Sequence, residues 1–145
     1  MTYDDIINNF TFLEKDFGYE LEDLVRHDNK SEFELRYSNR NANRSILVLS
    51  YANGLDVFVS KSENDAKVVR KLINNIANNE FNIADNVLEI TKGRVMEGDL
   101  KILYSPELFI KDYIKQYERI AGIYQDILRY DLKKVISGQE WINWK

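Results

Sequence analysis

Histidine, the side chain with the widest chemical use near neutral pH, occurs once, as His27 among Asp23, Asp28 and Asn29. A histidine beside carboxylates is a candidate general base or metal ligand. A metal site needs further ligands at a regular spacing, and this segment offers no second ligand of that kind. We therefore interpret His27 as a solvated loop histidine and predict that it holds no metal or cofactor.

Nucleophilic catalysis and phosphate binding also lack their usual residue patterns. The chain has no cysteine, no Gly-x-Ser-x-Gly sequence, and six glycines too scattered to form a phosphate-binding loop. Glu97-Gly98-Asp99 resembles part of a calcium loop but lacks the alternating oxygen ligands. We predict no catalytic residue and no cofactor, although a carboxylate pair that meets only in space stays open.

Acidic residues concentrate near the start of the sequence. Residues 1–32 hold nine acidic and three basic side chains, whereas the whole chain carries a net charge of −4. Such clustering can steer a basic partner to a surface, and it can equally keep a helix end or an edge strand soluble. The candidate partner-binding residues are Glu20, Glu22, Asp23 and Asp28.

The elements that position these acids follow from changes in the hydrophobic period. Thr2 and Asp5 have the capping-box form before a helix expected over about residues 3–16, which Gly18 ends. The period then becomes two, which predicts strands near 33–38, 46–49 and 55–59. Residues 33–38 should have one dry and one wet face, whereas 46–49 is apolar on both faces, as in a central strand. A further strand at 19–25 is weakened by Glu22 and Asp23.

The second half of the chain is expected to be mostly helical. An apolar stripe predicts a helix over about residues 62–79, and Ser105-Pro106-Glu107 starts another that reaches about residue 137. A helix of that length would span ~45 Å, which is longer than a compact domain of this size needs, so a break near residues 129–131 stays open. Residues 87–90 and 100–103 resemble short strands, and buried helix turns would look similar.

Aromatic residues near the end of the chain have two interpretations each. Tyr113, Tyr117 and Tyr124 share one helix face, which we expect to rest on the sheet as core, although tyrosine also suits interfaces. Trp141 and Trp144 should dock on the domain, because large exposed apolar side chains promote aggregation.

These elements predict a single α+β domain over residues 1–145. It should contain an N-terminal helix, an antiparallel β-meander of three to five strands, and a helical C-terminal half packed on one sheet face. A chain of 145 residues with a hydrophobic fraction of 44% can bury one core.

Composition also narrows the partners and the location. The acidic balance disfavours nucleic acid, whose phosphates are bound by lysine and arginine. No apolar run reaches bilayer length, and acids follow Met1 where a signal peptide would carry basic residues. We expect a cytoplasmic protein with a protein partner and neither a nucleic-acid nor a membrane partner.

The spacing of aromatic residues and glycines resembles that of small bacterial immunity-type proteins. The resemblance lies in Phe10-Thr11-Phe12-Leu13, in Phe17-Gly18-Tyr19, in the strands at 33–38 and 46–51, and in Ile136-Ser137-Gly138 before Trp141. Such proteins are cytosolic antidotes encoded beside toxins of polymorphic and contact-dependent systems. The resemblance implies a non-enzymatic inhibitor of one cognate toxin, often acting through an acidic surface on a basic nuclease. It implies no particular contact residue, because these families diverge at their binding surfaces.

Three classes of function stay open from the sequence. They are a toxin-neutralising binding protein, a homo-oligomeric structural or adaptor domain, and an enzyme with an unrecognised carboxylate site. The sequence specifies neither the oligomeric state nor the identity or activity of a toxin.

Overall fold

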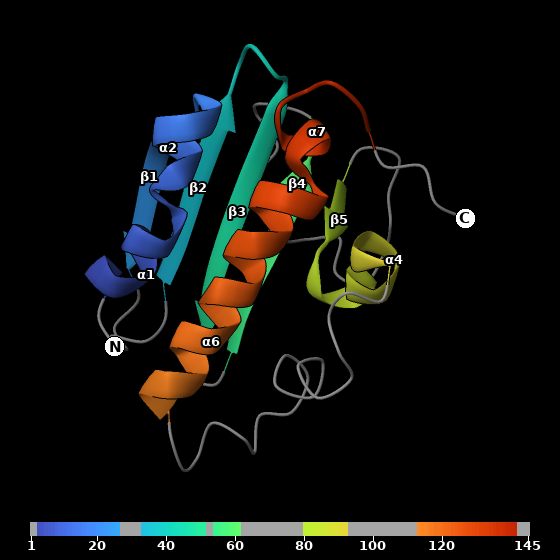
Figure 1. The fold of residues 1–145 in the computed structure, drawn as a ribbon. Coiled ribbons are helices and arrows are strands. Elements are labelled where there is room, and N and C mark those ends of the chain that lie inside the picture. The colour runs from blue at the N-terminus through green and yellow to red at the C-terminus, as the bar shows by residue number, and fades with distance from the viewer. Residues whose placement is uncertain (1–2, 27–32, 52–53, 62–79, 93–112, 142–145) are drawn as a thin grey trace.

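A computed structural model describes residues 3–26, 33–51, 54–61, 80–92 and 113–141 (Figure 1). Its first elements are two short helices, α1 (Tyr3–Phe10) and α2 (Phe12–Phe17), in place of one helix over about residues 3–16. They part at Thr11, whose hydroxyl donates a hydrogen bond of 3.0 Å to the carbonyl of Asn8. Such backward bonds compete with the helical pattern and bend helices. Gly18 ends α2 in the left-handed conformation (φ 75°), as predicted.

Five antiparallel strands then form one sheet in the order β1-β2-β3-β4-β5. They are β1 (Glu20–Arg26), β2 (Phe33–Asn39), β3 (Arg44–Tyr51), β4 (Gly54–Ser60) and β5 (Glu80–Asn82). Each strand pairs with the next along the chain, which confirms the predicted meander, including the weakly indicated first strand. β3 is the central strand, as its apolar residues on both faces indicate.

The helices cover one face of this sheet. Figure 1 shows α1, α2, α6 (Tyr113–Asp126) and α7 (Lys133–Ile136) lying across the same side of the strands. Tyr124, a residue of α6, is fully buried, and its hydroxyl donates a hydrogen bond of 2.7 Å to the carbonyl of Leu55 on β4. Tyr124 therefore belongs to the core, as expected. Apart from β5, the described part of the C-terminal half is helical, and α6 and α7 pack on one sheet face, as predicted.

The long C-terminal helix changes its winding at residues 127–131, the region where the sequence left a break open. After α6, the residues Ile127–Asp131 form a π turn, η3, in which the N–H of Leu132 donates to the carbonyl of Ile127 at 2.8 Å. Leu132 then leaves helical geometry (φ −105°, ψ 16°), and α7 begins at the next residue. Residues 113–136 are thus not one continuous α-helix, whereas 106–112 lie outside the described residues.

Residues 87–90 resemble a short strand in sequence, but they form helix turns, which is the alternative that the sequence left open. This segment is helical, with a 3₁₀ turn η1 (Ala84–Asn86) followed by α4 (Val87–Thr91). Asn82 at the end of β5 starts these turns, because its Oδ1 accepts the N–H of Ala84 at 2.9 Å and its carbonyl accepts Nδ2 of Asn86 at 2.8 Å. The apolar residues at 87–90 do not predict these helical turns, because the turns begin with hydrogen bonds of Asn82, which lies outside that run. The second expected strand, at 100–103, and the helix expected over 62–79 lie outside the described residues.

The expected wet face of β2 is also wrong. Glu34 and Ser38 on that face are buried, and the side chain of Arg36 is 15% exposed. Nη2 of Arg36 lies 2.6 Å from Oε2 of Glu34, so two opposite charges are buried together. A second buried cluster of Leu47, Leu49 and Phe58 belongs to the same sheet face. The alternation of apolar and polar residues along a strand shows which residues are polar. It does not show whether a charged side chain is exposed to solvent or buried in an ion pair.

Tyr37 on β2 offers a test of the core. Its side chain is fully buried, and its hydroxyl has no hydrogen-bond partner among the described residues. Burial, with a smaller effect from Glu14, raises the pKa of this phenol, which keeps it neutral. Because an unpaired buried hydroxyl is costly, we expect Tyr37→Phe to raise the free energy of unfolding by about 1 kcal/mol in urea titrations.

Tyr124→Phe is the matched control for this prediction. The Tyr124 hydroxyl is bonded to a backbone carbonyl, so its removal should lower the free energy of unfolding by about 1 kcal/mol. Equal losses of stability in the two variants would contradict the assignment of Tyr37 as unpaired.

Trp141 docks on the domain, as expected. Its half-buried ring packs against the main core, and the guanidinium of Arg44 lies 5.0 Å from the ring centroid. Arg44 is itself only 5% exposed, and it donates to the carbonyls of Val135 at 2.8 Å and Glu140 at 3.0 Å. The segment after α7 is thereby fastened to the start of β3. Trp144 lies outside the described residues.

Candidate functional site

The outermost strand β1 carries an irregularity in its acidic stretch. The register pairs Leu21 with Tyr37 and then Asp23 with Arg36, so Glu22 is an extra residue in a β-bulge. This bulge explains why Glu22 and Asp23 interrupt the alternating pattern. The strand continues through them because an added residue shifts the register without ending the pairing.

The bulge directs acidic positions to one side of the sheet. Glu20 stands opposite Ser38 in the register, and the Ser38 hydroxyl donates a hydrogen bond of 2.5 Å to Oε1 of Glu22. Asp23 is paired with Arg36, which lies on the same face of β2 as Ser38. Glu20 and Glu22 are both exposed. We call Glu20 and Glu22 the acidic edge.

Further acids lie on the neighbouring helix α2. Glu14 and Asp16 are exposed, and Oδ2 of Asp16 lies 3.6 Å from Nη2 of Arg129 on η3. The Arg129 guanidinium also lies 4.8 Å from the centroid of the Phe12 ring. Asp16 is therefore partly neutralised by an exposed ion pair, which contributes ~1 kcal/mol at most.

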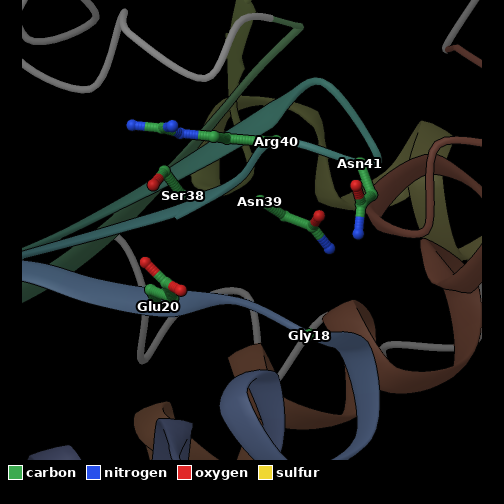
Figure 2. Close-up of a pocket in the computed structure, with 6 residues that line it drawn as sticks. All are labelled: Gly18, Glu20, Ser38, Asn39, Arg40 and Asn41. Atoms are coloured by element: carbon green, nitrogen blue, oxygen red, sulfur yellow. The ribbon is translucent and has the colours of Figure 1, made fainter.

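A pocket of about 370 Å³ adjoins the acidic edge (Figure 2). It lies where the turn between α2 and β1 meets the end of β2, and none of its lining side chains is apolar. The lining consists of Gly18, Glu20, Ser38, Asn39, Arg40 and Asn41. The groups that face this space accept or donate hydrogen bonds, and they suit binding to a polar or charged group.

Hydrogen bonds hold the floor of this pocket in place. Nδ2 of Asn39 donates to the carbonyl of Phe17 at 2.6 Å, and Oδ1 of Asn39 accepts the N–H of Ala42 at 3.1 Å. Both ends of the amide are therefore used within the protein. Asn39 ties the end of α2 to the turn after β2, and it acts as scaffold for the pocket.

The structure places part of the predicted partner-binding set. Glu20 and Glu22 lie exposed on an edge strand, and Asp23 belongs to the same strand, although its side chain is not among those described. Asp28 and His27 lie outside the described residues. Arg40 and Asn41 join Glu20 in the pocket, a grouping that was not predicted, because polar residues between two strands do not indicate which distant residue they meet.

The part of the chain that the structure describes contains no group of three or more histidine, cysteine, aspartate or glutamate residues that could hold a metal ion. Within the same residues, no helix has the length and apolar character needed to cross a membrane. No protein-family model, curated protein or solved structure matches the chain.

Proposed function

We propose that this protein is a non-enzymatic binding protein of the cytoplasm that neutralises a basic partner protein, as an immunity protein neutralises its cognate toxin. The observation that carries the proposal is the exposure of Glu20 and Glu22 on an edge strand. Carboxylates gathered on one surface raise the rate at which a basic partner arrives and disfavour acidic partners.

A foreign partner suits this edge better than a second copy of the same chain. Two β1 strands that paired with each other would bring like charges together, which destabilises cross-strand pairs. The bulge at Glu22 further interrupts regular edge-to-edge pairing. A basic surface on a different protein removes the repulsion and adds attraction, so the charges support heterologous binding.

Reversing the charges of the acidic edge tests the proposal. We expect Glu20→Lys combined with Glu22→Lys to slow association with the partner about tenfold at low salt, because exposed charges act mainly on the encounter rate. The difference should shrink as salt screens the charges. The partner to use is the product of the directly preceding gene, since the resemblance implies that an immunity protein is encoded after its toxin. Stopped-flow mixing measures the association rate.

A control variant separates local charge from net charge. Asp126→Lys combined with Glu140→Lys changes the net charge equally at exposed positions outside the acidic edge. We expect this variant to associate at nearly the unmodified rate. Equal slowing by both variants would sink the assignment of the acidic edge, and a preceding gene product that neither binds nor is inhibited would sink the proposed function.

A further inference from the structure

The pocket beside the acidic edge has the wrong lining for a typical small-molecule site. Pockets for cofactors and metabolites are mostly apolar, with a few polar groups that orient the ligand. Every side chain that lines this pocket is polar or charged, apart from Gly18, which has no side chain. A long polar side chain presented by another protein fits such a lining better, because its own backbone supplies the remaining contacts.

The hydrogen-bonding roles in the pocket favour a cationic group. The single Ser38 proton is directed to Glu22, so toward the pocket the Ser38 oxygen offers lone pairs. The Glu20 carboxylate only accepts, and Asn41 has an amide oxygen that can accept as well. Figure 2 shows the Glu20 carboxylate directed toward the β2 side of the pocket, where Ser38 lies. Arg40 is the one cation in the lining, and its charge opposes a bound cation.

We propose that this pocket receives an arginine side chain of the basic partner protein. The inference rests on the proposed function, and it adds the anchoring group and the residues that hold it. A guanidinium can form two parallel bonds to the Glu20 carboxylate and still donate to Ser38 or Asn41, whereas a lysine ammonium is a point charge. Arginines are common anchors at the centres of protein interfaces.

The test uses the full chain and the peptide acetyl-Gly-Arg-Gly-amide, in which the guanidinium is the only charge. Titration followed by two-dimensional amide NMR should give saturable shifts at Gly18, Glu20 and Asn41, with a Kd on the order of 10 mM. The same peptide with citrulline in place of arginine keeps the shape and removes the charge. Its shifts at these amides should be at least threefold smaller at equal concentration.

Two variants give opposite expected results, which separates this proposal from other ligands. Glu20→Gln should weaken peptide binding about fivefold, whereas Arg40→Gln should tighten it about twofold because a like charge is removed. Glu14→Gln, an exposed acid on α2 outside the pocket, should leave the Kd unchanged. The amide spectrum of each variant also reports whether it has folded.

Several results would overturn the arginine pocket. These are an absence of saturable shifts at the pocket amides, equal binding of the citrulline peptide, or weaker peptide binding in Arg40→Gln, which would show that the Arg40 charge does not oppose the bound group. Failure of the peptide to bind would not by itself contradict the proposed function, which is tested separately by charge reversal. If charge reversal at the acidic edge still slows association with the partner while the peptide does not bind, the pocket assignment alone falls.

Discussion

Replacing Arg44 by alanine is expected to lower the free energy of unfolding by about 4 kcal/mol, a large part of the total for a domain of this size. The guanidinium is buried and donates to four backbone carbonyls. Besides Val135 and Glu140, it reaches Ala42 and Asn43, each at 3.1 Å from Nη1. Alanine would remove the side-chain donor from all four carbonyls, although the Val135 carbonyl would keep the N–H of Gly138 at 3.2 Å. It would also remove the contact with the Trp141 ring.

The expected loss of stability is large because the Arg44 guanidinium donates hydrogen bonds at the end of helix α7. The last carbonyls of α7 have no partner within the helix and must find donors elsewhere. N–H groups of the segment after α7 donate to the carbonyls of Lys133, Lys134 and Val135. Arg44 adds a second donor to Val135 at 2.8 Å, and the Tyr19 hydroxyl donates to Ile136 at 2.6 Å. These two side-chain donors come from β3 and from the turn before β1, so they stabilise the helix end and the sheet together.

Urea unfolding followed by circular dichroism measures the Arg44 effect. Tyr19→Phe removes a single hydrogen bond at the same helix end and should cost about 1 kcal/mol. Lys133→Ala changes an exposed cation of α7 and should stay within about 0.5 kcal/mol of the parent protein. If Arg44→Ala were no more destabilising than Lys133→Ala, the bonds to the carbonyls would carry no net stability.

Gly138→Ala is expected to destabilise the fold by about 3 kcal/mol for two reasons that add. Gly138 has a φ of 84°, which side chains of L-residues rarely adopt. A Cβ at this position would also lie 2.8 Å from both Cα and the carbonyl oxygen of Ala42, which are backbone atoms that cannot turn aside. The backbone after α7 and the turn before β3 would have to separate.

Two other glycines isolate the two causes. Gly18 has a φ of 75°, but the nearest atom to a new Cβ would be Nδ2 of Asn39 at 3.6 Å, so Gly18→Ala should cost about 1 kcal/mol from backbone strain alone. Gly122 lies in α6 with open space around it, and Gly122→Ala should stabilise the fold by about 0.5 to 1 kcal/mol. Unfolding midpoints in the reverse order would contradict this account of Gly138.

The contacts of the C-terminal segment with Ala42 and Arg44 also affect the pocket. The turn that contains Arg40 and Asn41 is continuous with Ala42 and Arg44, which meet the C-terminal segment. Loss of the Arg44 bonds should therefore disturb the pocket as well as the stability. Gly122→Ala lies on α6, away from the residues that line the pocket, so its peptide binding should be unchanged.

Local patterns determined much of the fold from the sequence alone. The left-handed position of Gly18 and the alternation along 33–38 depend on the preferences of neighbouring residues, which act over a few residues of chain. The central place of 46–49 follows from apolar residues at successive positions, because only a strand covered on both sides tolerates them. The exposed acids Glu20 and Glu22 were also indicated by composition, since unpaired carboxylates favour the surface.

Tertiary structure decided the features that depend on partners far along the chain. Glu34 is buried where it pairs with Arg36, and Arg44 is buried where it donates to the carbonyl of Val135 in α7. The pocket exists only where the turn after α2 meets the end of β2, which brings Glu20 and Asn41 to one space. A sequence pattern reports the polarity of each residue, whereas burial and charge pairing depend on which distant residues the fold brings beside it.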